Sequence, residues 1–594
     1  MSAEDTNALI EQRRAKLASL REHGIDPFAN KFTPTEGCVP AKENYVEGRA
    51  VALAGRLTAL REMGKSLFFD IKDQTGRIQV YVQKQAVGED NFKILQHLDL
   101  GDFVGVKGAL FTTKMGEKSV KLESFTILGK ALRPPPAKWY GLEDTETRYR
   151  QRYLDLIAND DVKDVFLKRS AIVHEIRQFF HSRGYVEVET PAMQGIPGGA
   201  AAAPFKTFHN ALGCEFYLRI ALELYHKRLL VGGIDKLFEI GKNFRNEGLS
   251  RRHNPEFTML EAYQAFGDYE TMMETVESLI VRVAEAVFPN SRLEFPRVRY
   301  GETTREILQS LVYCWSNLSR FIESIPKSQT VEIESAKALL GELGEIRSKY
   351  DSSQHKQPHW EIARSALSEI LPLFERTKRT LETWNDPEHP TGLNSWVPQV
   401  DRHISALEKL TIEEVIVLAN PWKRVRYKDL VREKAGADWF EITPAERRQR
   451  AHDLGAEIGK DYEDFEITGA VFEKLIEPTL IQPTFVTHLP KELVPLAKLS
   501  PDDPTTVEVF ECCINGQEIA PGYTEQNDPI AQRNTLEHQA GGEQQKLDED
   551  FLVALEHGMP PAGGIGIGID RLCMMLLGQE SIRDVILFPQ MKPK

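Results

Sequence analysis

The sequence lacks the features that would place the protein in a membrane or outside the cell. No run of about 18 or more uninterrupted apolar residues occurs in the 594 residues. The N-terminal segment MSAEDTNALIEQRRAK also has no apolar stretch of the kind found in signal peptides. We therefore expect a cytoplasmic protein that has no membrane partner.

Cysteine is scarce, and the few cysteines form no metal-binding pattern. None of them makes a C-x-x-C motif or a cluster with histidine at zinc spacing. The six are Cys38, Cys214, Cys314, Cys512, Cys513 and Cys573. Reduced and mostly buried thiols are the expected state. Internal repeats and low-complexity tracts are absent as well.

Excess positive charge is missing from the chain as a whole. The formal net charge is −14, which argues against a protein that coats nucleic acid indiscriminately. Residues 50–132 depart from this balance, with 12 Lys and Arg against 9 Asp and Glu. A local basic surface for nucleic acid therefore remains possible in this segment.

The length and the sequence pattern indicate an α+β protein of roughly two to four domains. Residues 1–49 form a helical extension, with a charged helix expected at 8–22. Residues 50–132 contain five short β-like runs separated by glycines and polar turns, the pattern of an OB-fold β-barrel. Residues 133–148 contain three consecutive prolines and predict a semi-rigid linker.

The remaining chain is expected to form one α+β domain with an interruption. Its first part covers residues 149–305 and its second part covers 420–594, with β-rich runs alternating with helical stretches. Residues 306–419 are instead rich in helix-forming sequence with one apolar face. A packed helical bundle inserted between the two parts is the default interpretation, and no catalytic motif occurs in it.

The stretch FRNEGLSRRHNPEFTMLEAY at 244–263 is the most informative segment of the sequence. It gathers Arg245, Arg252 and His253 near glutamates, with Phe257 between them. If two antiparallel strands joined by a loop form here, alternate side chains share one face. Guanidinium groups match phosphate oxygens bidentately, so the segment could hold a triphosphate. A solvated charged hairpin is the alternative.

A glycine-rich stretch, GGIGIGIDRLCMML, occurs at 563–576. It looks like a dinucleotide-binding fingerprint, but no βαβ unit follows before the sequence ends. A closely packed glycine strand that lets the backbone approach a flat ligand fits better, with Arg571 supplying positive charge.

A third stretch, FECCINGQEIAPGYTEQND at 510–528, carries two glutamates seven positions apart. Glu511 and Glu518 converge only if INGQ turns the chain back as a hairpin. Converging carboxylates beside a triphosphate would suit Mg²⁺. A surface ion-pair role is the alternative on this stretch alone.

Taken together and in this order, the three stretches resemble the signature motifs of class II aminoacyl-tRNA synthetases. The motifs RNEG and RHNPEFTMLE are similar to those of the lysyl-tRNA synthetases in particular. The resemblance covers nearly the whole chain outside 306–419. This resemblance implies an antiparallel catalytic sheet flanked by helices, an N-terminal OB anticodon domain and a homodimer formed partly through GYVEVETPAM. It implies a lysine–tRNA ligase that uses ATP, L-lysine and tRNA(Lys), with Mg²⁺ as cofactor.

The resemblance also implies roles for individual residues at the nucleotide. ATP binding falls to Arg245, Arg252, His253, Asn254, Phe257 and Arg571. Arg245 would grip the α-phosphate and the lysine carboxylate, and Arg245 and Arg571 would be the catalytic pair. Arg252 and His253 would face the γ-phosphate, while Phe257 and Arg571 would enclose adenine and Asn254 would touch it. Glu511 and Glu518 would hold Mg²⁺.

The amino acid and the tRNA are assigned in the same way. Lysine binding falls to Gly199, Glu223, Glu261, Tyr263 and Glu525, with the first two at the α-ammonium and the others at the side-chain ammonium. A buried cation needs such carboxylates to offset its desolvation. Anticodon binding falls to Arg61, Phe68, Gln79 and Glu117, with Phe68 stacking on a central base.

The sequence departs from the family at a few positions near these residues. Pro521 stands where an asparagine usually helps to hold the lysine carboxylate, and proline has no side-chain amide. Leu222 replaces a usual proline, and Val509 and Gln517 replace usual arginines. The family also passes almost directly from RYGETT to PWKRVRYKDLV, so residues 306–419 would be an accessory insertion on a surface loop.

Three alternatives compete with this interpretation. A synthetase-like enzyme that lysylates a protein would lack the anticodon barrel expected at 50–132. A non-catalytic tRNA-binding protein would have lost the arginines and carboxylates that are present here. Aspartyl or asparaginyl specificity is a closer rival, but Glu223, Glu261 and Glu525 favour a cationic substrate.

Overall fold

The computed structural model describes residues 3–136, 142, 144–291, 293–296, 415–539 and 545–593, together with isolated positions between 338 and 379. The chain divides into two compact units, Met1–Asp160 and Asp161–Lys594. Across the described part of the chain, every helix is too short or too polar to cross a lipid bilayer.

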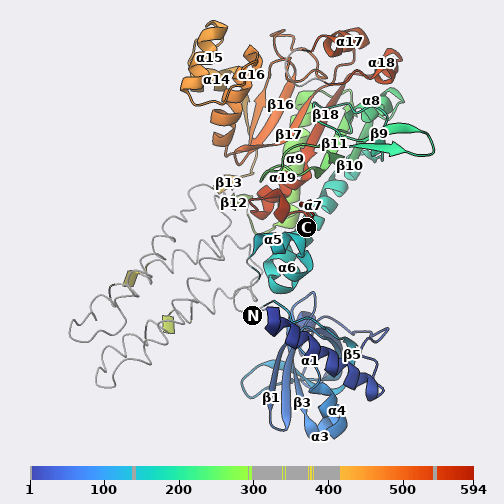
Figure 1. The fold of residues 1–594 in the computed structure, drawn as a ribbon. Coiled ribbons are helices and arrows are strands. Elements are labelled where there is room, and N and C mark those ends of the chain that lie inside the picture. The colour runs from blue at the N-terminus through green and yellow to red at the C-terminus, as the bar shows by residue number, and fades with distance from the viewer. Residues whose placement is uncertain are drawn as a thin grey trace. The chain divides into compact units, whose positions relative to one another are not determined.

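The first unit is built around a closed five-stranded barrel with the strand order β1-β2-β3-β5-β4 (Figure 1). Its strands are β1 (Ala50–Met63), β2 (Ser66–Lys72), β3 (Arg77–Gln83), β4 (Phe103–Thr112) and β5 (Lys118–Gly129). Alternate residues of β2 are fully buried, Leu67, Phe69 and Ile71 among them, as the period of a half-buried strand requires. This barrel confirms the OB-fold expected from the sequence.

The first unit also contains helices. They are α1 (Ala3–Glu22), α2 (Cys38–Glu43), α3 (Lys84–Val87), α4 (Glu89–Leu95), α5 (Thr145–Arg150) and α6 (Arg152–Ala158). The guanidinium of Arg13 on α1 donates to the carbonyl oxygens of Ala131, Arg133 and Leu100, which fixes this helix to the end of the barrel chain. Helix α5 begins inside the segment expected as a linker, and residues 137–141 of that linker lie outside the described part.

The second unit is organised around an eight-stranded sheet with the order β14-β15-β16-β17-β18-β11-β10-β6. The strands are β6 (Val186–Glu187), β10 (Lys236–Phe244), β11 (Glu256–Ala265), β14 (Lys423–Arg426), β15 (Thr484–Thr487), β16 (Val509–Ile514), β17 (Gln517–Thr524) and β18 (Ala562–Gly568). Only the two outer pairs, β14 with β15 and β6 with β10, run parallel. The antiparallel catalytic sheet expected from the sequence is therefore confirmed.

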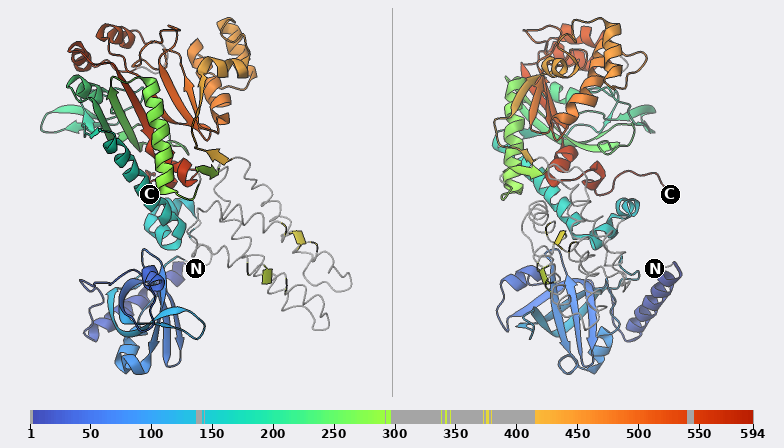
Figure 2. Two further views of the ribbon diagram at one scale, coloured as in Figure 1. Left: turned by 180° about the vertical axis from the view of Figure 1, so that it is seen from behind. Right: turned by 90° about the vertical axis from the view of Figure 1, so that its left-hand side faces the viewer.

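One face of this sheet is covered by long helices. Apolar side chains of α7 (Asp160–Ser182), α9 (Tyr269–Val287) and α19 (Ile569–Leu577) pack with Leu260 and Ala262 of β11 into the main core. Figure 2 shows α9 lying across the sheet. Because side chains alternate along a strand, Glu261 and Tyr263 must point to the opposite face.

Smaller elements complete the second unit. They are β7 (Met193–Gln194), β8 (Lys206–His209), β9 (Cys214–Leu218), α8 (Glu223–Val231), α14 (Tyr427–Ala435), α15 (Pro444–Asp453), α16 (Asp464–Val471), α17 (Pro529–Glu537) and α18 (Glu549–Glu556). A π-helical turn at Phe472–Ile476 and a 3₁₀ turn at Glu477–Thr479 continue α16, and a further 3₁₀ turn occupies Ile582–Asp584.

The expected helical insertion at 306–419 lies almost entirely outside the described residues. Its surroundings are informative, however, because β12 (Glu294–Pro296) pairs antiparallel with β13 (Val415–Val417). The chain therefore leaves the second unit and re-enters it at neighbouring points. Such an arrangement suits a segment inserted on one connection.

Candidate active site

The strand pair β10–β11 and the loop 245–255 between them form the arginine-rich hairpin expected from the sequence. The backbone N–H of Arg245 donates to Pro255 O at 2.9 Å and closes the base of the loop. A tight turn near its tip is held by Ser250, whose hydroxyl lies 2.8 Å from His253 Nδ1. The guanidinium of Arg245 lies 5.3 Å from the centroid of the Phe257 ring.

Arg571 links this hairpin to the glycine strand and to β17. It is the third residue of α19, directly after β18, and its guanidinium lies 3.2 Å from His253 Nε2. The same group donates to Glu518 O at 3.1 Å and lies 3.5 Å from Glu518 Oε2. Burial and then the Arg571 charge lower the pKa of His253. A neutral imidazole beside a guanidinium is the consequence.

Arg252 and Asn254 lie around the same cluster in different ways. Arg252 is half exposed, and its guanidinium stands 4.0 Å from Glu477 Oε1. Asn254 is buried, and its amide nitrogen donates to Glu256 O and to Gln590 Oε1, both at 2.6 Å. Its amide oxygen has no hydrogen-bond partner within the described chain. This oxygen is therefore available to accept a hydrogen bond from a ligand.

Glu511 and Glu518 are brought together by the predicted hairpin. Strands β16 and β17 are joined by a two-residue turn, Asn515–Gly516, in which both residues have positive φ (59° and 68°). That geometry favours the Asn-Gly sequence found there. Burial, followed by the charges of Glu518 and Glu477, raises the pKa of Glu511 well above its usual value. An added cation would relieve this repulsion.

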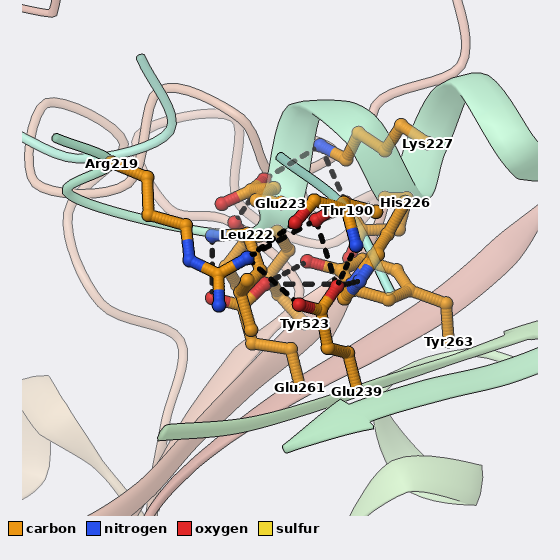
Figure 3. Close-up of polar contacts among 11 residues, drawn as sticks. Thr190, Arg219, Leu222, Glu223, His226, Lys227, Glu239, Glu261, Tyr263 and Tyr523 are labelled. Carbon is orange, nitrogen blue, oxygen red and sulfur yellow. Dashed lines mark hydrogen bonds and ion pairs between the residues drawn. The ribbon is translucent and has the colours of Figure 1, made fainter. Parts of the chain in front are cut away.

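A second group of acidic residues lies near the arginine-rich hairpin. We call Glu223, Glu261 and Glu525 the acidic cluster; all three are at most 6% exposed. Figure 3 shows Glu223 and Glu261 with their polar neighbours. Glu223 begins α8, Glu261 lies on β11, and Glu525 follows β17 directly. The charge of Glu261 also acts on Arg245, so the two clusters are electrostatically connected.

Hydrogen bonds fix the orientation of two carboxylates in the acidic cluster. Glu223 Oε1 accepts from the hydroxyl of Tyr523 at 2.5 Å. Glu261 accepts from the backbone N–H of Leu222 at 3.2 Å and from the hydroxyl of Tyr263 at 3.1 Å. Burial raises the pKa of Glu261 to about 7 and that of Glu525 to about 8. These carboxylates are therefore poised to exchange a proton for another cation.

Two glycines allow the backbone to pack closely around these carboxylates. A Cβ at Gly564 on β18 would overlap Glu525 Oε1 and would lie 2.6 Å from Tyr263 Cε1. Gly199 has φ +82°, and a Cβ there would lie 3.3 Å from Glu223 Cβ. The glycine at 564 thus makes room for a side chain of the protein itself, whereas the sequence suggested a flat ligand.

Sequence reasoning missed several residues around the acidic cluster. The ammonium of Lys227, on α8 and fully buried, lies 2.8 Å from Glu223 Oε1 and 2.6 Å from Glu525 Oε2. A Glu–Lys pair four positions apart on a helix is a recognised signal, and it was present in ELYHKRLL.

Pro521, the expected departure, lies opposite Glu511 in the β16–β17 register.

A neighbouring network was also missed because its members are far apart in sequence. Glu239 accepts from Arg219 at 2.7 Å and from the Thr190 hydroxyl at 2.7 Å, and it lies 3.1 Å from His226 Nε2. Burial acts to raise the pKa of Glu239, but these partners outweigh it and lower the pKa. Glu239 is therefore already neutralised, unlike the acidic cluster beside it.

The four residues expected to read an anticodon all lie on the barrel of the first unit. Phe68 points away from the core, and its ring lies 4.8 Å from that of Tyr81, which in turn lies 5.6 Å from Phe111. Arg61 is exposed and pairs with Phe68 across β1 and β2. The remaining two are Gln79, which accepts from the Ser119 hydroxyl at 3.1 Å, and Glu117, which lies 3.4 Å from Lys42 Nζ.

Comparison with known families matches both units. Residues 144–592 match the family described as tRNA synthetases class II (D, K and N), and residues 51–128 match the OB-fold nucleic acid binding domain. The curated relatives include the lysine–tRNA ligase of Pelotomaculum thermopropionicum, 40% identical over 602 residues, with 100% of this chain and 96% of the relative covered.

Two further relatives carry the same name. The lysine–tRNA ligase of Moorella thermoacetica is 40% identical over 603 residues, with all of both chains covered. That of Bacillus subtilis is 39% identical over 607 residues, with 100% of this chain and 98% of the relative covered. The similarity therefore extends over the full length of both units.

Proposed function

This chain belongs to the class II tRNA synthetases of the D, K and N group, and on that premise we propose that it is a lysine–tRNA ligase. It activates L-lysine with ATP to lysyl-adenylate and transfers the lysyl group to the 3′ end of tRNA(Lys). The observation that carries lysine as the substrate is the acidic cluster, three buried carboxylates beside an arginine-rich triphosphate site. An aspartate or asparagine substrate would find no matching charge there.

Activation requires positioning and charge neutralisation, and no side-chain nucleophile takes part. The lysine carboxylate attacks the α-phosphorus of ATP, the bond to the β-phosphate oxygen breaks, and pyrophosphate leaves. Arg245 holds the α-phosphate and the attacking carboxylate, while Arg571 and Phe257 enclose adenine. Arg252 and His253 stand where the γ-phosphate lies. A ribose hydroxyl of the terminal adenosine then attacks the adenylate carbonyl and releases AMP.

Glu511 and Glu518 are the residues that would hold Mg²⁺. Their fit is supported by the raised pKa of Glu511, which reflects burial and then uncompensated carboxylates. Within the described chain, no three His, Cys, Asp or Glu side chains form a complete metal site, so phosphate oxygens and water would complete the coordination. Bound there, the ion supplies charge neutralisation to the phosphates.

One experiment tests the substrate assignment. ATP–pyrophosphate exchange is measured with each of the twenty amino acids, and total tRNA is then charged with any amino acid that supports exchange. We expect lysine alone to support rapid exchange and tRNA(Lys) to be the product. Exchange with aspartate or asparagine would refute the lysine assignment. Exchange without tRNA charging would favour a protein-lysylating paralogue, and no exchange would favour a non-catalytic tRNA-binding protein.

The barrel at 50–132 is the proposed anticodon-binding domain. Phe68 presents its ring outward, and stacking of a base on such a ring contributes about 1 to 3 kcal/mol. Arg61 lies opposite Phe68 in the register of β1 and β2, and Arg61, Gln79 and Glu117 are proposed to read base edges. Residues 306–419 are proposed to be an accessory helical insertion, which agrees with the pairing of β12 with β13 on either side of it.

The protein is further proposed to act as a cytoplasmic homodimer. Apolar side chains of the GYVEVETPAM segment and of β8 are unusually exposed for a protein surface, with Val186 and Met193 at 53% and Phe208 at 59%. Burial of these groups against a second copy would remove them from water. A monomeric mass in light scattering at micromolar concentration would contradict this proposal.

The acidic cluster predicts that lysine binding depends on pH. The groups surrounding Glu261 and Glu525 are Glu223, His226, Lys227, Tyr263 and Tyr523. The pKa values of about 7 and about 8 mean that both carboxylates hold protons in mildly acidic solution. A lysine ammonium must displace those protons, so the KM for lysine should fall as pH rises from 6 and should level off above about pH 8.

The expected slope is about tenfold per pH unit for each proton displaced. Steady-state exchange from pH 6 to 8.5 gives the KM for lysine, and the KM for ATP in the same assays is the internal control. A lysine KM that does not change over this range would contradict the assignment of these carboxylates.

A methyl group at Gly564 should weaken lysine binding selectively. In Gly564→Ala the new Cβ meets Glu525 Oε1 and displaces that carboxylate. We expect the KM for lysine to rise about tenfold or more, with a stability loss of about 1 to 3 kcal/mol from overpacking. The KM for ATP should change little.

The matched control for this substitution is Gly469→Ala, since a Cβ at that helical position meets nothing within 4 Å. Thermal unfolding and exchange kinetics are measured on both variants. Equal lysine KM values in the two would show that Glu525 does not depend on the space above Gly564.

A further inference from the structure

The fully buried cation Lys227 contacts two carboxylates of the acidic cluster. Its ammonium lies 2.8 Å from Glu223 Oε1, 2.6 Å from Glu525 Oε2 and 3.3 Å from Leu496 O. These three protein oxygens surround the ammonium, and the side chain is fully buried. We therefore assign Lys227 to contacts within the protein and not to ATP or lysine.

The surroundings of Lys227 hold it as a charged group. Burial acts to lower its pKa, but the charges of Glu223 and Glu525 outweigh burial and raise the pKa. The rings of Tyr523 and Phe551 lie 5.6 Å and 5.9 Å from the ammonium and add cation–π attraction. These contacts thus favour the charged form of Lys227.

The charges of the acidic cluster can be counted because its neighbours are already paired. Glu239 is paired with Arg219, and the ring of His226 lies between Glu239 and Glu261. Once the substrate has displaced their protons, Glu223, Glu261 and Glu525 carry three negative charges, and Lys227 cancels one of them. Two negative charges remain for a ligand. L-lysine brings two ammonium groups, and its carboxylate is left to Arg245.

We infer that Lys227 is a positioning and specificity-determining residue whose ammonium sets the charge of the acidic cluster to match a diamino acid and holds Glu223 and Glu525 in place. This inference rests on the proposed function. The inference explains how three carboxylates can lie in one buried cluster. One oxygen of Glu223 and one of Glu525 contact the same Lys227 nitrogen, and without its charge the two oxygens would repel each other at short distance.

The test uses the full-length Lys227→Met variant, which keeps most of the side-chain volume and removes the charge. The matched control is Lys168→Met on α7, where the lysine is partly exposed and pairs with Asp164 at 2.7 Å. At pH 7 we expect the lysine KM of K227M to rise about a hundredfold, as for a broken buried ion pair, with the ATP KM unchanged within about threefold. K168M should behave as the wild type.

A second measurement needs no substrate. In K227M the unpaired carboxylates should take up protons in the folded state, which raises their folded pKa values above the unfolded ones. Proton uptake by these carboxylates stabilises the folded state at low pH, and this stabilisation is lost as pH rises. The midpoint of thermal unfolding of ligand-free K227M should therefore fall more steeply from pH 6 to 9 than that of the wild type or of K168M.

The double variant Lys227→Met/Glu525→Gln restores the native count of two negative charges. We expect its unfolding midpoint to recover the pH dependence of the wild type, even if K227M alone is too unstable for kinetics. A K227M variant with wild-type lysine KM and wild-type pH dependence would overturn the inference, as would a double variant that is no better than K227M. Absence of lysine-dependent exchange in the wild type would instead refute the proposed function.

Discussion

Arg245→Ala should reduce lysine-dependent ATP–pyrophosphate exchange by about a thousandfold or more, while the protein remains folded. Arg245 follows β10 directly, at the base of the hairpin loop, and it lies over the Phe257 ring. The charges of Glu518, Arg571 and Glu261 all act on its guanidinium. Arg245 therefore lies between the proposed triphosphate site and the acidic cluster. In the proposed mechanism, its removal takes away charge stabilisation of the α-phosphate and the anchor of the attacking carboxylate together.

The fold should tolerate this change because the guanidinium is not a structural anchor. Among the described residues, Arg245 Nε has no hydrogen-bond partner, and burial lowers the pKa of the group. Thermal unfolding should stay within a few degrees of the wild type, and Arg282→Ala, at an exposed position of α9, is the control. Near-normal exchange in the Arg245 variant would remove this residue from the proposed mechanism.

Glu525→Gln should raise the KM for lysine by about a hundredfold or more and leave the KM for ATP nearly unchanged. The carboxylate is 1% exposed, so the amide that replaces it removes a buried negative charge that the substrate ammonium needs. Removal of one partner from a buried ion pair costs about 3 to 5 kcal/mol. Exchange measured over a wide lysine range separates this effect on KM from an effect on kcat.

The control for this prediction is Glu537→Gln on α17. That carboxylate is well exposed and pairs with Arg533 at 3.6 Å, so its loss should change neither KM nor stability appreciably. If Glu525→Gln instead lowered kcat with an unchanged lysine KM, Glu525 would contribute to the chemical step and not to recognition of the side chain.

Local sequence signals predicted the elements that depend on neighbours along the chain. The barrel strands alternate buried and exposed residues, and the β16–β17 turn has the Asn-Gly pair that its positive φ angles require. A hairpin also forms at 244–263, but its first strand ends at Phe244, so Arg245, Arg252 and His253 lie in the loop and not on the strand face that was expected. These features depend on interactions between residues that are close in sequence, and such interactions can be predicted from a single sequence.

The contacts that complete the site were harder to foresee. Tyr523 reaches Glu223 across 300 positions of sequence, and Arg219, Thr190 and Glu239 meet only after the sheet forms. Nothing in the local pattern distinguishes these residues from ordinary polar residues. The Glu223–Lys227 pair had a local signal, but its second partner, Glu525, is supplied by a distant strand.

The glycine-rich strand β18 was predicted in part. Its glycines indicated close packing, and the structure places Glu525 Oε1 and the Tyr263 ring above Gly564. Sequence alone could state that something approaches the backbone at this point. Which side chain occupies the space is decided by the order of β17, β18 and β11 in the sheet.

The adjacency of β12 and β13 bears on how such a chain could change over generations. Since the two strands hold the ends of the interruption together, the length of chain between them is not fixed by the catalytic sheet. Each doubling of a flexible connection costs only about 0.6 kcal/mol in closure entropy. A lineage could therefore acquire, trim or exchange the segment in one genetic event and inherit an enzyme whose catalytic centre needs no compensating mutations.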